Sequence, residues 1–254
     1  MSNQTLKHTG YETGGRTPKE SEGTARPDAR QERGRQTKLA IVEGAALAFE
    51  RQGFSAATLA EIESLSGISQ GAIYFHYKTK EKIALAVMQE QHDRTYAHVE
   101  KALPSTSDPL EQIMQVSRVV CDLLSTDAVV RAGISLALEQ GTLQEKSTES
   151  YDTWTRGIAF LLRKAVAREF IRPVLPIEKL ARELVGNFTG VQMMAQTTSD
   201  RTSLLEDVTA MWQVFIAAVS NPDHQERYQH ATRELFTPSE AHHPITQTQS
   251  EAEE

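Results

Sequence analysis

The sequence contains a single cysteine, Cys121, so it cannot form an intramolecular disulfide or a cysteine-built zinc site. It has no apolar run near the roughly 18 residues that a membrane-spanning helix needs. Its N-terminus also lacks the apolar segment of a secretory signal. These absences predict a protein of the reducing cytoplasm with no membrane partner.

Catalytic motifs are missing too. There is no H-E-x-x-H helix, no glycine-rich phosphate loop and no G-x-S-x-G turn. Cys121 lies among Val119, Val120, Leu123 and Leu124, a setting typical of a buried thiol rather than a nucleophile. We therefore predict no enzyme activity, no catalytic or metal-binding residue and no cofactor.

A positive net charge is also absent, since the formal value is −7 at pH 7. The charge is unevenly distributed, because residues 26–80 hold eight basic and six acidic side chains while the remainder is acidic. Any contact with nucleic acid is therefore expected in the first third of the chain.

Helical periodicity extends through most of the chain, without a convincing alternating strand pattern. We predict an all-α protein of about nine helices, with a small domain over residues 35–82 and a larger one over 83–222. Polar composition predicts a disordered arm over residues 1–34 and a mostly disordered acidic tail over 223–254.

Two short helices separated by a glycine turn are predicted near residue 67. Thr58 with Glu61 forms a capping box, and Ser69 can cap the second helix after Gly67. This pattern is typical of a helix-turn-helix, whose second helix places its first residues at base edges in the major groove. The candidate DNA-binding residues are Thr58, Ser69, Gln70, Gly71, Tyr74, His76, Lys78 and Lys80.

Each outward residue has a possible role on DNA. Gln70 can pair with adenine, Gly71 allows close backbone approach, and Tyr74 can contact a phosphate or a thymine methyl group. Lys78 and Lys80 can bind phosphate. Ala72 and Ile73, with Phe75 or His76, are expected to pack inward. For any one residue taken alone, an aromatic core and solvated lysines are the favoured explanation, but the whole arrangement favours DNA.

The segment TLAEIESLSGISQGAIYFHYKTKEKIALAV (58–87) resembles the DNA-binding domain of the TetR family of bacterial repressors. It departs from the family at Gln70, where many relatives carry lysine, and in its long N-terminal arm. DAVVRAGISLALEQ (127–140), Trp154 and ELVGNFTGVQMMAQ (183–196) resemble the γ-butyrolactone receptor subgroup. The resemblance covers about residues 36–220. It implies a homodimer on a pseudo-palindromic operator, released by a small γ-butyrolactone or butenolide signal and controlling antibiotic biosynthesis.

Polar residues on apolar helix faces suggest where such an effector binds. Gln91 interrupts a stripe of apolar residues on a helix expected over 79–103, so it needs a partner, either a ligand oxygen or a protein carbonyl. The resemblance places Trp154, Gln91 and Thr189 in the effector pocket. The full set of candidate ligand-binding residues is Gln91, Trp154, Thr189, Met88, Val185 and Met193. Trp154 and Met193 could equally fill core.

Two other functions fit the same pattern. One is a drug or antibiotic sensor that controls an efflux pump, and the other is a DNA-binding protein without an effector. A helix beginning at Pro176 that is apolar on two sides argues against the second. Drug sensors often present buried carboxylates to cations, whereas the residues inferred here favour a neutral lactone.

Overall fold

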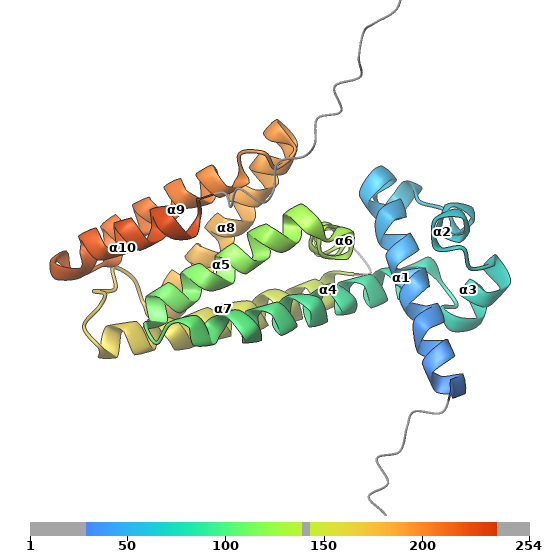
Figure 1. Ribbon diagram of the computed structural model, residues 1–254, viewed down its shortest axis with the longest axis horizontal. Coiled ribbons are helices and arrows are strands. Elements are labelled where there is room, and N and C mark those ends of the chain that lie inside the picture. The colour runs from blue at the N-terminus through green and yellow to red at the C-terminus, as the bar shows by residue number, and fades with distance from the viewer. Residues whose placement is uncertain (1–28, 139–142, 238–254) are drawn as a thin grey trace, which may run out of the picture.

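The computed structural model describes residues 29–138 and 143–237, and these form ten α-helices rather than about nine, which confirms the all-α class (Figure 1). The helices are, in chain order, α1 (Ala29–Ala56), α2 (Leu59–Ser66), α3 (Gln70–His76), α4 (Lys80–Ala102), α5 (Pro109–Thr126), α6 (Ala128–Leu136), α7 (Gln144–Ala167), α8 (Ile177–Ser199), α9 (Leu204–Val219) and α10 (Pro222–Leu235), with a 3₁₀ turn (Leu103–Ser105) after α4. None of the helices in these ranges is long and apolar enough to cross a membrane.

The helices enclose two hydrophobic cores. One joins α1, α2 and α3 to the first half of α4 and to α6, and its centre holds the fully buried Ile41, Ile62 and Ile73. The other joins α5 to α7, α8, α9 and α10 around Trp212. Helix α4 runs from the first core along the second (Figure 1). A displacement of α4 or α6 would therefore change the packing of both cores.

Local capping signals place the helix starts correctly. Asp108 caps α5, because its Oδ1 accepts a hydrogen bond from the backbone N–H of Leu110 at 2.8 Å, and Pro109 occupies the first position. Asp127 caps α6 in the same way, and α8 begins directly after Pro176.

Two helices begin earlier than expected. Helix α1 starts at Ala29, so residues 29–34 are helical and do not belong to an arm; residues 1–28 lie outside the described residues. Helix α7 starts at Gln144, although the apolar period that contains Trp154 predicts a helix only from about Glu149. Gly53 ends the regular part of α1 with a left-handed φ of 78°, a conformation that glycine adopts without strain.

The predicted tail boundary at residue 223 is wrong, because α10 occupies Pro222–Leu235. Tyr228 and Thr232 bury one side of this polar helix. The Tyr228 hydroxyl donates to Asp108 Oδ2 at 2.8 Å, and Arg227 Nη2 donates to the same oxygen at 2.7 Å. Helix α10 is thus tied to the start of α5. Residues 238–254 lie outside the described residues.

Candidate functional site

The α2–turn–α3 unit is held by the caps that the sequence predicts. The Thr58 hydroxyl accepts from the Glu61 backbone N–H, and Glu61 Oε2 accepts in return from the Thr58 backbone N–H at 2.9 Å. Gly67 ends α2 with a φ of 70°, and the Ser69 side chain caps α3. These contacts confirm the two short helices and the glycine turn of the helix-turn-helix. Thr58 and Ser69 have structural roles within it.

The outward face of α3 is accessible. Apart from its own helical turn, no atom of the described residues lies within 4 Å of the position that a Cβ at Gly71 would occupy, so the backbone is open to close approach. Gln70 is exposed, and its Nε2 donates to Glu63 Oε2 at 2.8 Å. Tyr74 is 58% exposed and Phe75 is 73% exposed. Of the two rings expected inward, Phe75 is exposed and His76 is the one that is half-buried, while Ile73 is buried as predicted.

Lys78 and Lys80 have different environments. Lys80 Nζ donates to the backbone carbonyls of Ser55 and Ala57, at 3.0 Å each, and lies 4.9 Å from the centre of the Phe54 ring. Lys80 thus joins the start of α4 to the α1–α2 turn with two of its three ammonium protons, and a phosphate contact of the third stays a prediction. Lys78 is exposed and lies over the Tyr74 ring at 5.1 Å.

His76 belongs to the same face as Lys78 and Tyr74 but is half-buried. Its ring packs edge-on against Phe75, with a centroid distance of 5.3 Å. The accessible set is therefore Gln70, Gly71, Tyr74, Phe75 and Lys78, with His76 at its margin. We call this set the reading face. A cation beside exposed aromatic rings and an open helix start can meet both phosphates and base edges.

Lys78→Ala should weaken binding to every operator sequence to a similar extent and lower the slope of log K against log salt by about one, because one phosphate contact is lost. Lys80→Ala is the matched control. It should leave that slope nearly unchanged but lower the melting temperature, since two carbonyls lose a donor. Fluorescence anisotropy at several salt concentrations measures the slope, and the reverse pattern would refute the distinction.

A cavity of about 110 Å³ lies in the second core, among α4, α5, α6, α7 and α8. Most of its wall is aliphatic or aromatic, from Ile113, Val116, Val120, Ile134, Ala137, Ile158, Leu184, Val185 and Phe188. Its polar wall consists of Gln91, Thr95, Ser117, Ser150, Tyr151, Trp154, Thr189 and Gln192. An apolar cavity with a few convergent polar groups is typical of a small-molecule site.

Three hydroxyl groups of the cavity wall have their protons engaged by their own helices. Thr95 donates to the carbonyl of Gln91 at 2.8 Å, Thr189 to that of Val185 at 2.9 Å, and Ser117 to that of Ile113 at 3.2 Å. Gln91 Nε2 donates to Thr95 Oγ1 at 3.1 Å. These hydroxyls can still accept hydrogen bonds but have no proton left to donate.

Two aromatic rings outside the cavity lie beside the wall residue Trp154. Trp154 of α7 stacks on Tyr96 of α4, with ring centres 5.0 Å apart, and His92 lies 4.4 Å from Tyr96. Burial raises the pKa of Tyr96, and burial also raises that of Tyr151, although the Thr189 hydroxyl opposes the second shift. Both phenols are therefore protonated at neutral pH and can act as donors.

The structure brings together four of the six expected ligand-binding residues. Gln91, Trp154, Val185 and Thr189 line the cavity, whereas Met193 is 45% exposed and does not. Met88 is buried in the first core and borders only a smaller adjoining hollow. Met88 and Met193 are thus corrected; a ligand contact of the other four stays a prediction.

Sequence reasoning missed Phe188 and Gln192 as wall residues. With Leu184 they repeat every fourth residue along α8, so the helical period places all three on one face. A polar Gln192 on that apolar face is the same signal that identified Gln91. Cys121 is buried nearby, and burial raises the pKa of its thiol to about 12, so it is not a nucleophile at neutral pH.

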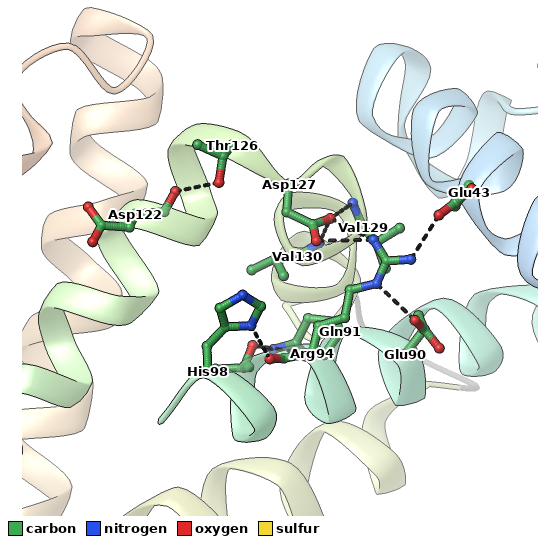
Figure 2. Close-up of polar contacts among 11 residues, drawn as sticks. Glu43, Glu90, Gln91, Arg94, His98, Asp122, Thr126, Asp127, Val129 and Val130 are labelled. Atoms are coloured by element: carbon green, nitrogen blue, oxygen red, sulfur yellow. Dashed lines mark hydrogen bonds and ion pairs between the residues drawn. The ribbon is translucent and has the colours of Figure 1, made fainter. Parts of the chain in front are cut away.

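Helix α6 lines the cavity with Ile134 and also packs against α1 in the first core. Figure 2 shows the polar contacts that join the start of α6 to α4 and α1. Arg94 of α4 pairs with Asp127 at the start of α6 at 3.0 Å, with Glu43 of α1 at 2.9 Å and with Glu90 at 2.8 Å. Burial alone would lower the pKa of Arg94, but hydrogen bonds to these carboxylates outweigh it and raise that pKa. The guanidinium therefore stays charged and joins three helices.

Two further contacts make α6 sensitive to its neighbours. Arg131 of α6 pairs with Glu50 of α1. On the opposite side, a Cβ at Gly133 would lie 2.4 Å from the Cβ of Gln91, so α6 and α4 approach closely at a cavity residue. Ile134, the residue after Gly133, and Ala137, one turn after it, line the cavity itself. Filling the cavity thus presses on a helix that contacts α1.

Comparison with known proteins covers both parts of the chain. Residues 41–87 match the family described as "Bacterial regulatory proteins, tetR family". Residues 107–221 match "Tetracyclin repressor-like, C-terminal domain". The first match contains the reading face and the second contains most of the cavity wall.

Individual relatives agree with these matches. The chain is 28% identical to the A-factor receptor protein of Streptomyces griseus over 76% of this chain and 67% of that protein. It is 33% identical to TylP, a TetR regulator from Streptomyces fradiae, over 82% of this chain and 93% of that one, with a TM-score of 0.61. A γ-butyrolactone receptor described as ArpA-like shares the fold, with 24% identity, a TM-score of 0.66 and coverage of 81% and 98%.

Proposed function

Because this chain belongs to the TetR family of DNA-binding regulators, we propose that it represses transcription as a homodimer until a neutral, largely apolar signal of lactone type fills its cavity. The observation that carries this proposal is the position of the cavity. Its wall includes Gln91 of α4 and Ile134 of α6, and both helices also pack against α1 in the first core. Such a ligand can shift the reading faces of a dimer without touching DNA.

The chemistry of the wall supports a neutral ligand. The described residues that line the cavity include no carboxylate and no ammonium or guanidinium group. A cationic drug would therefore lose its hydration without gaining a charged partner, which is costly. The names of two relatives, an A-factor receptor and a γ-butyrolactone receptor, support a lactone. We extend this to control of antibiotic biosynthesis.

The size of the cavity supports coupling between ligand and DNA. About 110 Å³ is near the volume that accepts one benzene ring, so a lactone with a long chain must displace the walls. Inverting operator occupancy requires a preference of about 10⁴ for the released state. Burying a chain of six to eight carbons, at about 0.8 kcal/mol for each CH₂, supplies a free energy of the size that such a preference requires.

Exposed apolar side chains support a dimer interface formed by α8 and α9. Met194 of α8 is 66% exposed and Val214 of α9 is 73% exposed, and these two helices pack against each other (Figure 1). The two reading faces of such a dimer must match half-sites about 34–36 Å apart on the DNA. A small change in the distance between them therefore releases both.

Trp154→Ala should leave operator binding intact but raise the lactone concentration needed for release by about a hundredfold, because the largest wall contact is lost. Trp154→Phe is the control and should respond within about tenfold of wild type. The operator is first selected from random DNA with the purified protein. Release is then measured by anisotropy with 2-acyl-γ-butyrolactones.

Circular dichroism melts accompany both Trp154 variants, so that loss of response is not confused with unfolding. The proposal fails if the wild-type protein holds its operator at saturating lactone. A folded Trp154→Ala protein that responds like wild type would place the effector elsewhere.

A further inference from the structure

We propose that Gln192 selects effectors that present a hydrogen-bond donor, an inference that rests on the proposed effector function. Gln192 lines the cavity and is only 7% exposed. No described group of the protein donates a hydrogen bond to its Oε1 atom. Buried acceptors nearly always have a donor. An unpaired acceptor in the wall of a binding cavity therefore indicates a donor that arrives with the ligand.

The neighbouring hydroxyl groups strengthen this assignment. Thr189 lies one turn before Gln192 on α8, and its proton is given to the Val185 carbonyl at 2.9 Å. Thr95 and Ser117 give their protons to carbonyls of their own helices as well. Thr95 Oγ1 already accepts from Gln91 Nε2 at 3.1 Å, and Thr189 is hydrogen-bonded to the Tyr151 phenol. None of these hydroxyls has a proton left for Gln192 Oε1, whereas a hydroxyl group of the ligand could donate one.

This arrangement determines which part of a lactone faces α8. The lactone carbonyl needs a donor, and the phenol of Tyr151 on α7 can become one by exchanging its present hydrogen bond with Thr189 for a bond to the ligand. A hydroxyl on the side chain of the effector satisfies Gln192 Oε1 instead. A site built to pair with a hydroxyl rejects analogues that lack it, because its own buried oxygen then stays unpaired. Gln192 is therefore a specificity-determining residue, and the effector is a hydroxylated lactone.

The first test needs no ligand. Gln192→Met keeps the length of the side chain and removes the buried acceptor, so the melting temperature of the free protein should rise by about 2–4 °C. Gln196→Met is the matched control, since Gln196 is exposed on the same helix one turn further on. It should change the melting temperature by less than about 1 °C. A fall in the melting temperature of Gln192→Met would mean that Oε1 is already paired in the free protein, and would overturn the proposal.

The second test uses γ-butyrolactones with an eight-carbon 2-alkyl chain. The chain is unsubstituted, or carries a hydroxyl on its first, second or third carbon, or carries a ketone at the same positions. Calorimetry with wild type and Gln196→Met should show one hydroxylated isomer binding about ten- to a hundredfold more tightly than its ketone and its unsubstituted parent. In Gln192→Met that advantage should fall below about threefold.

The outcomes separate this inference from the proposed function. If lactones bind but no hydroxyl improves affinity, or if the improvement persists in Gln192→Met, the inference is wrong and the lactone sensor stands. If no lactone binds the wild-type protein, the proposed function fails. In that case the melting temperature of Gln192→Met still decides whether Gln192 holds an unpaired acceptor.

Discussion

Gly133→Ala should lower the free energy of unfolding by about 1–3 kcal/mol, and Gly133→Val by more, because neither side chain fits between α6 and α4. A Cβ at this position would lie 2.4 Å from Gln91 Cβ and 2.7 Å from Gln91 Cγ. Those atoms lie next to the backbone of α4, so a rotation of the glutamine side chain cannot relieve the contact. The two helices must separate, which also disturbs the cavity.

Urea unfolding at a fixed protein concentration measures this effect, because the stability of a dimer depends on concentration. Gly157→Ala is the control. Gly157 also lies within a helix, and no atom lies within 4 Å of its built Cβ. Alanine there should stabilise the protein by about 0.5–1 kcal/mol. Equal effects of the two alanine substitutions would show that the α4–α6 approach is looser than described.

Asp108→Ala should lower the free energy of unfolding by about 3–5 kcal/mol, because one buried carboxylate serves two helices. It caps α5 through the backbone N–H groups of Leu110 and Glu111. Its other oxygen accepts from Tyr228, whose hydroxyl would be left buried and unpaired. Burial raises the pKa of Tyr228, as does the bond to Asp108, so the phenol stays a donor throughout the neutral range.

A double-mutant cycle separates the two roles of Asp108. Tyr228→Phe alone should cost less than Asp108→Ala, and Asp108→Asn should retain most of the cap. If the effects of Asp108→Ala and Tyr228→Phe simply add in the double variant, the two side chains are not coupled. Thermal melts of the three single variants and the double variant, made at one protein concentration, provide the comparison.

The sequence predicts features that are determined within a few residues. The caps at Thr58 and Ser69 are predicted correctly, because a side chain and the backbone it caps are neighbours in the chain. Helix α10 was missed because its buried side is carried by Tyr228 and Thr232 in an otherwise polar segment. The partner of Tyr228 lies 120 residues away, and no local pattern reveals it.

The candidate sites show the same division. A polar residue on an apolar face, such as Gln91, is visible in the sequence, and the structure places it on the cavity wall. The period of a helix does not show which of two buried faces meets a cavity. The sequence therefore indicates Met193 as a ligand-binding residue, whereas the structure places Gln192 on the cavity wall. The sequence pattern suggests only a phosphate contact for Lys80. It does not reveal the two carbonyls that Lys80 contacts, because they lie in a turn more than twenty residues earlier.

The sharing of α4 and α6 between the cores affects how such regulators can be recombined. Ile83 and Met88 of α4, with Val129 and Leu136 of α6, complete the core beneath the reading face. A hybrid joined directly after α3 would place a foreign α4 and α6 against the original α1, and their surfaces would not fit. The DNA-reading end is therefore not an exchangeable module. A new pairing of operator and signal in this lineage has to arise by substitutions matched across the junction, not by shuffling of domains.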